Sequence, residues 1–376
     1  MDVQELTARE FQAADGTADW RVIGRDAQAW FATPSHAAGA AMIRRIAESG
    51  AALDADLRAR GVRVRLPRPG ARFTGHELEL ARTVSSAAAT LGLSAETDGL
   101  QLVQIGIDSQ DASAVLPFWA EVLGHHREGD AVLRDPGRRL ASVWFQEQDA
   151  PRPLRNRVHL DMVTATETAR AALDAVPGHG GEVRQHNDFY ATVADADGNE
   201  ADLLPLSEGA DRWPGADAED WRLVFAAVAS YPTRGVEQTL DLADAAAHLA
   251  DEAGVALGID AVDIPAVRRF WAAALGYVED PRQGVTDLVH PHQLTMPFFL
   301  QELDPDDRER RAQRNRIHVD VFVPDDLAPA RVDAALAAGG SITYDAEAPA
   351  WWTLVDPEGN EVCIAVSPGR EERWGE

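Results

Sequence analysis

Two eight-residue segments of the sequence carry the residue types that could do chemistry. RNRVHLDM occupies positions 155–162, and RNRIHVDV occupies positions 314–321. Each alternates apolar with polar residues, which is typical of a half-buried β-strand. His159 therefore shares one strand face with Arg157 and Asp161. Such a histidine belongs either to an exposed polar ladder or to the wall of a pocket, and the strand pattern leaves both interpretations open.

The side chains of these segments suit acid–base chemistry or anion binding. An imidazole has the right intrinsic pKa for general acid–base work, and a neighbouring aspartate or arginine can tune it. Arg157 and Arg316 could hold a carboxylate or enolate oxygen. The alternatives are structural, with histidines that satisfy a buried hydrogen bond and arginines that pair with the adjacent aspartate across strands. The candidate catalytic residues are His159, His318, Arg157 and Asp161.

Length and composition narrow the class of protein. A chain of 376 residues is long enough for two or three domains. Its formal charge of −27 opposes binding to nucleic acid or to an anionic membrane. Because the chain contains no lysine, Schiff-base chemistry, pyridoxal phosphate attachment and a P-loop are excluded. Cys363 is the single cysteine, so an internal disulfide and a cysteine-based zinc site are excluded too.

The sequence predicts a cytoplasmic protein with a small-molecule partner. The segment MDVQELTAREF has neither the basic start nor the apolar core of a signal peptide. No apolar run approaches the ~20 residues that span a bilayer. The partner that we expect is a small-molecule ligand or substrate, with no nucleic acid and no membrane, and a homodimer is the one assembly that we consider.

The region around each of the two segments is duplicated. Both copies contain Phe-Trp followed by Leu-Gly (118–124 and 270–276), and both end in Asp-x-x-Gly-Asn-Glu (195–200 and 356–361). The motifs keep the same order and a near-constant offset, which is how an internal repeat is recognised. We therefore predict two related units, at residues 99–206 and 254–376.

Four signals coincide in each unit: Ile-Asp-x-x-Asp, Phe-Trp with Leu-Gly, Asn-Arg-x-His-x-Asp and Asp-x-x-Gly-Asn-Glu. Together they resemble the vicinal-oxygen-chelate (glyoxalase and bleomycin-resistance) superfamily, particularly its glyoxalase-like branch. The resemblance implies an α+β fold in which paired βαβββ motifs curl around a concave pocket. Such pockets serve metal-assisted isomerases, lyases and dioxygenases, and also drug-binding proteins that do no chemistry, so the fold alone does not decide the function.

The resemblance also implies where a metal would bind. The usual ligand positions fall on Gln104, His159 and Asp202 in the first unit. An amide, an imidazole and a carboxylate suit a weakly held divalent cation. In the second unit the same positions hold Ala256, His318 and Cys363. Alanine is no ligand, so a divalent metal in the first unit is the one cofactor that we expect, and none is required.

Aromatic residues on the penultimate strand of each unit could line the pocket. They are Tyr190 in the first unit and Trp351 with Trp352 in the second. With Arg316 they form the candidate ligand-binding set, although core packing explains the same aromatic residues equally well. Two histidine pairs, His125-His126 and His290-Pro-His292, have no nearby carboxylates that complete a ligand set, and we expect them in surface loops.

Residues 1–98 resemble pterin-4a-carbinolamine dehydratases. The resemblance rests on a strand that begins at Trp20 and on the helix start FTGHELELA, in which Thr74 and Glu77 are spaced as a capping box. It implies a small α+β domain. The family's His-His-Pro falls on Ala-Ala-Leu at 51–53, and its later histidine falls near Arg68. Because alanine cannot transfer a proton, the catalytic groups of that family are missing.

Residues 207–253 predict a helical connector. Asp-Trp-Arg-Leu at 220–223 repeats Asp-Trp-Arg-Val at 19–22, so the connector is either a truncated copy of the N-terminal unit or a packed linker. The function that we expect is a lyase- or isomerase-type enzyme of specialised or detoxifying metabolism, acting on a small oxygenated organic molecule. A non-catalytic protein that sequesters its ligand is the alternative, and a pterin carbinolamine dehydratase is the third candidate.

Overall fold

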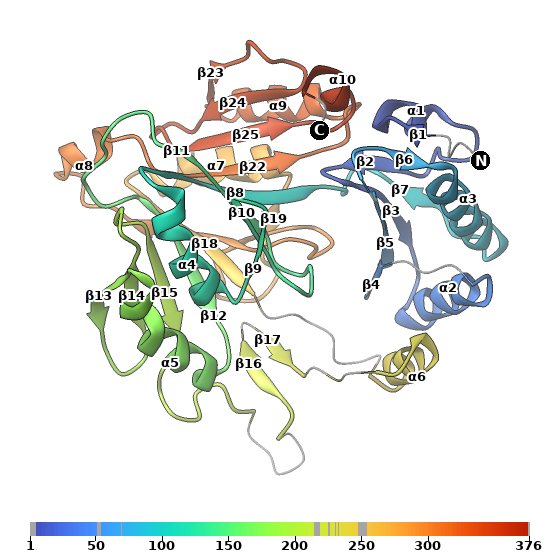
Figure 1. Cartoon of the computed structure of the whole chain (residues 1–376), viewed down its shortest axis with the longest axis horizontal. Coiled ribbons are helices and arrows are strands. Elements are labelled where there is room, and N and C mark those ends of the chain that lie inside the picture. Colours follow the sequence, from blue (N-terminus) through green and yellow to red (C-terminus); the bar gives the residue numbers. More distant parts are fainter. Residues whose placement is uncertain are drawn as a thin grey trace.

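The computed structural model describes residues 5–50, 54–68, 70–213, 219–224, 226–229, 231, 233–246 and 254–374. They form a small N-terminal α+β unit and two eight-stranded sheets. The N-terminal unit lies against one of these two sheets, close to the C-terminal helix (Figure 1). Within the described part of the chain, no helix is long and apolar enough to cross a membrane.

The sheet of the N-terminal unit has one apolar and one polar face because its strands alternate. Its main strands are ordered β2 (Arg21–Ile23), β3 (Asp26–Ala32), β5 (Gly61–Pro67) and β4 (Asp54–Arg58), and β7 (Ala95–Glu96) pairs with β3. The unit also contains β1 (Glu5–Leu6), β6 (Phe73–Thr74), α1 (Ala8–Ala13), α2 (His36–Glu48) and α3 (Gly75–Thr90). Phe31 and Val62 pack in the apolar core with the helices, whereas Gln28 and Arg63 point to the opposite side.

The helix starts of this unit follow from its capping residues. The Ser35 hydroxyl accepts from the Ala38 backbone N–H at the start of α2. The predicted capping box of Thr74 and Glu77 is confirmed at the start of α3. The unit is α+β, as predicted for residues 1–98, while its resemblance to pterin dehydratases stays a prediction. Residues 51–53, where that family has His-His-Pro, lie outside the described residues.

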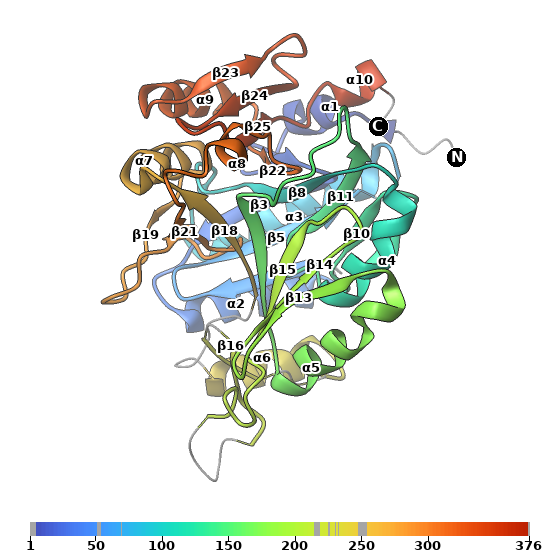
Figure 2. The same cartoon turned by 90° about the vertical axis from the view of Figure 1, so that its left-hand side faces the viewer.

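The two duplicated units pair within the chain by exchanging halves (Figure 2). The β8/β22 sheet runs in the order β23 (Ser341–Tyr344), β24 (Trp351–Val355), β25 (Glu361–Ala365), β22 (Ile317–Phe322), β8 (Leu102–Ser109), β11 (Ser142–Glu147), β10 (Val132–Arg134), β9 (His126–Glu128). The β12/β18 sheet runs in the order β13 (Glu182–His186), β14 (Ala191–Ala194), β15 (Glu200–Leu204), β12 (Val158–Val163), β18 (Val255–Ala261), β21 (Phe298–Glu302), β20 (Leu288–Val289), β19 (Val278–Glu279). Each sheet therefore takes four strands from each unit.

One continuous apolar core joins the two sheets to the helices that follow β8 and β18. Phe118 and Trp119 on one helix and Phe270 and Trp271 on the other are fully buried in it. These helices are α4 (Ala112–Leu123) and α7 (Ile264–Leu275), and the other helices of the two units are α5 (Thr166–Ala175), α8 (Arg308–Ala312), α9 (Ala328–Ala337) and α10 (Arg370–Trp374). The repeated Phe-Trp motif is thus a core motif.

The two copies of the Asn-Arg motif bind each other where the sheets meet. Asn156 Oδ1 accepts from the backbone N–H of Arg316 at 2.9 Å. Asn315 Oδ1 accepts from the backbone N–H of Arg157 at 3.1 Å. We call these reciprocal bonds the Asn156/Asn315 crossing. Both asparagines are buried, so each satisfies a backbone N–H that water does not reach.

The terminal turns extend the crossing into a network. Asn156 Nδ2 donates to Asn199 Oδ1 at 2.8 Å, and Asn199 Nδ2 donates to Asp195 at 2.9 Å. The Asp195 carboxylate also accepts from the indole N–H of Trp119 at 2.8 Å. The second copy repeats these bonds with Asn315, Asn360, Asp356 and Trp271. The motifs that define the repeat are therefore largely one hydrogen-bonded framework.

Arg157 and Arg316 belong to this framework. Arg316 donates to the backbone carbonyls of Gly198 at 2.8 Å and Leu154 at 3.0 Å, and Arg157 donates to the carbonyl of Glu358 at 2.6 Å. Each arginine is only 1% exposed. This placement corrects the prediction that the two guanidiniums hold a carboxylate or enolate, and also its alternative of an ion pair with the adjacent aspartate. Most of their hydrogen bonds go to backbone carbonyls at the junction instead; Arg316 Nε donates to Asn199 Oδ1, and Arg157 Nε has no partner among the described residues.

The connector contains a short hairpin and a helix. Its described elements are β16 (Arg222–Val224), β17 (Ala226–Val228) and α6 (Val236–Ala246). Helix α6 lies along α2, where Arg44 pairs with Glu237 (Figure 1). The strand–strand–helix order matches β2, β3 and α2, and both a truncated copy and a packed linker stay open as interpretations.

The crossing generates a prediction about stability. Asn156→Ala and Asn315→Ala should each lower the free energy of unfolding by about 2 kcal/mol, because each leaves a buried backbone N–H unpaired. Urea unfolding followed by tryptophan fluorescence measures the change. Asn187→Ala is the matched control, since Asn187 accepts from the backbone N–H of Phe189 in an exposed turn and its loss should cost much less. Equal effects at buried and exposed asparagines would contradict the role of the crossing.

Candidate functional site

Polar side chains from four strands form two adjacent rows across the β8/β22 sheet. Cys363, Asp320, Gln104 and Ser142 are register partners on β25, β22, β8 and β11. The next row holds His318, Gly106 and Trp144. The Gln104 side-chain amide donates to the Ser142 hydroxyl at 2.8 Å. Both duplicated units contribute to this site, because β8 and β11 come from the first and β22 and β25 from the second.

A glycine in each central strand makes room for the histidine ring. A Cβ on Gly106 would lie 2.2 Å from His318 Cε1, and a Cβ on Gly258 would lie 2.5 Å from His159 Cε1. No other residue fits without moving the ring. Each histidine therefore lies across the neighbouring strand, where it meets an aromatic ring edge-on: Trp144 for His318 and Phe299 for His159.

Asp320 is the carboxylate of the β8/β22 rows that faces open space. Its Oδ2 accepts from the indole N–H of Trp144 at 2.7 Å, and its Oδ1 lies 3.8 Å from His318 Nε2. On the far side of the ring, His318 Nδ1 lies 3.7 Å from Asp108. Burial, and then the charge of Asp320, raises the pKa of the Cys363 thiol well above its ordinary value. The thiol therefore stays protonated and is no nucleophile.

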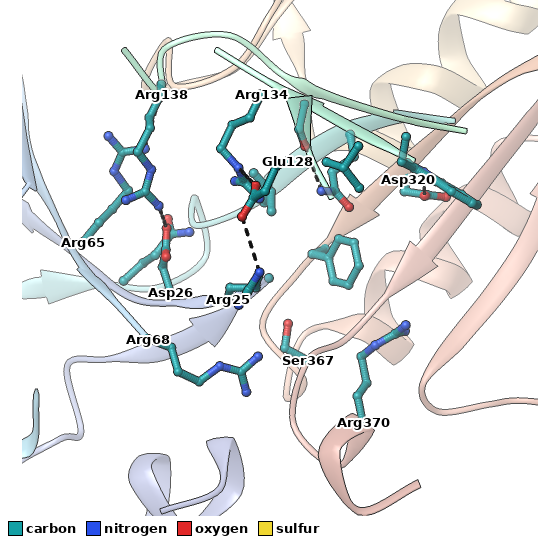
Figure 3. Close-up of a pocket in the computed structure, with 18 of the residues that line it drawn as sticks. Arg25, Asp26, Arg65, Arg68, Glu128, Arg134, Arg138, Asp320, Ser367 and Arg370 are labelled. Carbon is teal, nitrogen blue, oxygen red and sulfur yellow. Dashed lines mark hydrogen bonds and ion pairs between the residues drawn. The ribbon is translucent and has the colours of Figure 1, made fainter. Parts of the chain in front are cut away.

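A cavity of about 720 Å³ opens above this part of the sheet. Its floor includes Gln104, Ser142, Trp144 and Asp320, and its opposite wall comes from β3 and β5 of the N-terminal unit. Figure 3 shows arginines that enter the cavity from several sides, with Asp320 among the β22 side chains. The lining arginines are Arg25, Arg63, Arg65, Arg68, Arg134, Arg138 and Arg370.

A second cluster lies on the β12/β18 sheet. His159, Asp161 and Asp202 present ligand atoms that all lie within 4.8 Å of one another. Asp161 and Asp202 are register partners on β12 and β15, and the Thr192 hydroxyl donates to Asp202 at 2.6 Å. His159 Nε2 lies 3.5 Å from Asp161 Oδ1. An imidazole with two carboxylates is a donor set that divalent cations accept.

The β12/β18 cluster is electrostatically strained. Burial, followed by the charges of Asp202 and Asp287, raises the pKa of Asp161 to about 8. Burial lowers the pKa of His159 despite the opposing charges of Asp260 and Asp202, so its imidazole is neutral near pH 7. Asp161 Oδ1 is buried and has no hydrogen-bond partner among the described residues. These features are what a cation bound between the three side chains would relieve.

The structure corrects the predicted metal set. His159 and Asp202 do come together, but Gln104 lies on the β8/β22 sheet, beside Asp320 and not beside His159. The position opposite Asp161 on β18 is Ala256. The reason is the exchange of halves, which gives the first strand of each unit to the sheet that carries the other unit's histidine. The third side chain of the cluster is therefore Asp161, and not Gln104 as predicted.

The predicted aromatic wall is not part of the cavity. Trp352 packs against the apolar core, and Trp351 stacks with Tyr344. Tyr190 lies just before β14, where its hydroxyl accepts from Gln185 at 2.8 Å. These residues do not line the cavity of the β8/β22 sheet, although Arg370, which lies over the Trp351 ring, does.

Two histidines that were expected in surface loops are buried. His125 is 3% exposed and contacts the carbonyls of Leu123 and Ala141, and His290 is 2% exposed and contacts the carbonyl of Gly99. His292 stacks on Trp30 at the junction with the N-terminal unit. These contacts make His125, His290 and His292 structural, which corrects the expectation for them, whereas His126 is exposed as expected.

Sequence reasoning missed Asp320 and the arginines of the cavity. Asp320 holds the same repeat position as Asp161, so the repeat itself contained the signal. Arg63 and Arg65 alternate on β5 with buried Val62 and Val64, which marks a polar strand face. Nothing in the sequence indicated that this face would lie over another unit.

Both units match one family model. A glyoxalase-like domain model covers residues 104–204 and 256–365. The chain belongs to this glyoxalase-like family. The match confirms the predicted duplication and the superfamily, and the two β-rich halves agree with the predicted α+β fold. Among curated proteins, none shows significant similarity to the sequence.

Several solved structures share part of the fold. Glyoxalase I from Zea mays has 11% identity, a TM-score of 0.43, and coverage of 71% of this chain and 93% of that chain. The cppA protein of Streptococcus pneumoniae has 8% identity, a TM-score of 0.35, and coverage of 70% and 97%. A glyoxalase/bleomycin resistance protein/dioxygenase family enzyme from Burkholderia phytofirmans has 18% identity, a TM-score of 0.23, and coverage of 30% and 96%. No functional argument follows from them at these TM-scores.

The raised pKa of Asp161 generates a pH prediction. In the unfolded chain Asp161 loses its proton near pH 4, whereas in the folded chain it keeps the proton until about pH 8. The folded state therefore binds the extra proton, and its stability falls as pH rises through this window. Between pH 5 and pH 8, Asp161→Asn should gain up to about 4 kcal/mol relative to wild type, measured by urea unfolding in EDTA. Asp345→Asn, at an exposed position, should show no such gain, and a pH-independent difference for Asp161→Asn would contradict the assignment.

Proposed function

We propose that this chain is a lyase- or isomerase-type enzyme that acts on a small oxygenated organic molecule in the cavity above the β8/β22 sheet. The observation that carries the proposal is the placement of Asp320. Its carboxylate lines a cavity of about 720 Å³, a size typical of small-molecule sites, and it is held by the Trp144 indole next to His318. A positioned carboxylate beside an imidazole is a general acid–base pair.

The geometry supports a proton transfer. Trp144 fixes one oxygen of Asp320, and the carboxylate, which also contacts the Cys363 thiol, would accept a proton from a carbon next to a carbonyl group. The electron pair of that C–H bond then moves toward the carbonyl oxygen. Return of the proton to a neighbouring atom completes an isomerisation, and departure of a group from the adjacent carbon completes a lyase reaction. Residues from β8, β11 and β22 thus act on one substrate.

A second candidate is a protein that sequesters its ligand without chemistry. Gln104 stands where the superfamily usually has a histidine ligand, and its amide is engaged by Ser142. Cys363 stands at the usual carboxylate position as a protonated thiol. His318, Asp320 and Cys363 do present ligand atoms within 4.8 Å of one another, but a protonated thiol departs from the usual ligand set of the superfamily, which favours binding without turnover. The third candidate, a pterin carbinolamine dehydratase, would need proton-transfer groups in the N-terminal unit, where Arg68 instead lines the cavity.

We infer that a divalent cation binds at the β12/β18 cluster. His159, Asp161 and Asp202 would hold it, and the supporting observations are their mutual distances and the buried Asp161 oxygen without a partner among the described residues. A cation held there supplies Lewis acidity toward an oxygen of a bound molecule. The three side chains orient one another, and Thr192 fixes Asp202 from the neighbouring strand.

Deuterium exchange tests the enzyme proposal. Proton NMR in D₂O follows the α-protons of 2-oxo acids, 2-hydroxy acids and their phosphorylated analogues. With a turned-over compound, Asp320→Asn should lower the exchange rate by ~100-fold or more, because an amide accepts no proton. Asp345→Asn, an exposed aspartate after β23, is the matched control. Exchange that persists in Asp320→Asn refutes its role, and ligand binding without any exchange favours sequestration.

Metal titration tests the cation proposal. Wild-type protein dialysed against chelator should bind about one Mn²⁺ per chain, detected by loss of the free-ion signal in electron paramagnetic resonance. His159→Ala and Asp202→Asn should each weaken binding by at least ~10-fold. The counterpart His318→Ala lies on the other sheet and should bind as wild type does. Full binding by His159→Ala, or none by wild type, would refute the site.

A further inference from the structure

The cavity above the β8/β22 sheet has the opposite charge to the chain as a whole. Seven arginines line it, against three acidic residues, Asp26, Glu128 and Asp320. Two further carboxylates stand behind the wall, where Asp56 pairs with Arg63 and Asp54 pairs with Arg138. These two carboxylates neutralise part of the wall, and arginine remains the commonest charged residue among those that line the cavity. In a chain with a net charge of −27, this excess is local and must be held in place by the fold.

The arginines converge from three separate parts of the chain. Arg63 and Arg65 lie on the polar face of β5, with Arg25 and Arg68 in the neighbouring turns of the same unit. Arg134 and Arg138 come from β10 and the loop after it, and Arg370 begins α10. Figure 3 shows the arginines that it labels, among them Arg25, Arg65 and Arg370, around one space. The N-terminal unit therefore supplies most of the positive wall of a cavity whose floor is glyoxalase-like.

Part of this positive charge is buried without full compensation. Arg63 is 7% exposed, and burial lowers its pKa, with Arg65 and Arg58 acting in the same direction and Asp56 opposing them. Arg65 Nη1 donates to the backbone carbonyl of Arg138 at 3.1 Å, and its nearest carboxylate, Asp56, is 3.9 Å away. The Arg65 Nε–H is buried and has no acceptor among the described residues. A desolvated guanidinium with an unused donor is unfavourable, and an anion in the cavity would supply both an acceptor and a counter-charge.

The opposite end of the cavity suits the uncharged part of a ligand. Trp144 contributes apolar surface there, beside Asp320, whereas the lining residues Leu102 and Phe322 pack against a cluster that includes Ile23 and Trp30 of the N-terminal unit. Asp320 lies on this side, on β22, and Figure 3 shows it away from Arg65 and Arg68. Because a carboxylate repels an anion, a ligand with one charged end would enter with that end toward the N-terminal unit. Its neutral, oxygenated end would then lie over Asp320.

We propose that this cavity binds a small organic anion carrying at least two negative charges, as carboxylates or a phosphate, with Arg65 and its neighbours on the N-terminal unit as the anion-binding wall. The proposal rests on the proposed function only in using the same cavity. The net charge of the chain excludes a polymeric polyanion as the ligand, since a long anion would meet an acidic surface outside the cavity. The N-terminal unit is then a specificity element and not a second enzyme.

Calorimetric titration of the full chain tests the inference. The probes are 2-oxoglutarate for a dicarboxylate, phosphoenolpyruvate for a phosphate ester, inorganic pyrophosphate for an anion without an organic body, and the neutral dimethyl ester of 2-oxoglutarate. We expect one of the two organic anions to bind, with an affinity that falls as salt rises, and the ester not to bind. The affinities for phosphoenolpyruvate and 2-oxoglutarate, compared with each other, show whether the preferred ligand is a phosphate ester or a dicarboxylate. Binding of the ester as tightly as of its parent acid would overturn the proposal, as would the absence of binding by any anion.

Variants locate the binding to the wall. Arg65→Gln should weaken binding of the anion roughly tenfold or more. Gln28→Glu places a carboxylate on the same wall without removing a guanidinium, and it should also weaken binding of the anion. This second variant keeps the test valid if Arg65→Gln is poorly folded. The control is Arg127→Gln, because Arg127 is an exposed arginine of β9 that pairs with Asp130 outside the cavity. Unchanged affinity in a folded Arg65→Gln and in Gln28→Glu would refute the assignment.

Asp320→Asn separates this inference from the enzyme proposal. The variant removes a negative charge from the floor, so it should bind the anion at least as tightly as wild type does, while any deuterium exchange is lost. Anion binding without exchange in wild type leaves this inference standing and refutes the enzyme. Exchange that does not respond to Arg65→Gln or Gln28→Glu refutes this inference and leaves the enzyme standing.

Discussion

The Asn156/Asn315 crossing is the constraint on which the rest of the structure depends. Each asparagine satisfies a buried backbone N–H of the other repeat and holds the terminal turn of its own. Two buried arginines add donors to carbonyls across the same junction. The bonds are reciprocal, so neither repeat can form its buried backbone contacts alone. The junction adjoins the strand pairs β8–β22 and β12–β18, through which the two repeats share each sheet.

The exchange explains why the two floors differ. The β8/β22 sheet combines Gln104 from one repeat with His318 and Cys363 from the other, whereas the β12/β18 sheet combines Ala256 with His159 and Asp202. One floor presents a single open carboxylate under an arginine-rich wall. The other presents a neutral imidazole and two carboxylates, and one oxygen of Asp161 has no hydrogen-bond partner among the described residues. The same motif therefore supports two different electrostatic environments, because its neighbours come from different units.

Local features of the fold could be predicted from the sequence, and long-range pairings could not. The cap at Ser35 and the capping box at Thr74 depend on neighbouring residues, and the structure contains both. The strand predicted at 155–162 is present as β12, which begins only at Val158. Strand neighbours are decided by contacts such as that between Asn156 and Arg316, which are 160 residues apart. Because both repeats carry the same motif, the sequence does not distinguish pairing within a unit from pairing between units. Gln104 was therefore assigned to the wrong histidine.

In the candidate site, too, the contacts within one half of a repeat could be predicted from the sequence, and the contacts between distant parts of the chain could not. His159 and Asp202 were predicted together correctly because both lie in the second half of one repeat, which stays on one sheet. The buried roles of Arg157 and His290 were missed, because their acceptors are backbone carbonyls that have no signature in a sequence. The arginine wall was missed for a different reason. Its residues alternate correctly on β5, but only the packing of one unit on another shows what the polar face covers.

The chain has one N-terminal unit but two glyoxalase-like floors, and this difference in number affects how the chain could evolve. A symmetric dimer of single units would carry two identical sites, and any substitution would alter both. Here the fused repeats make the two sites chemically independent, and the N-terminal unit covers only one of them. Each site can therefore change its ligand without a compensating change in the other, while the shared junction keeps both in register.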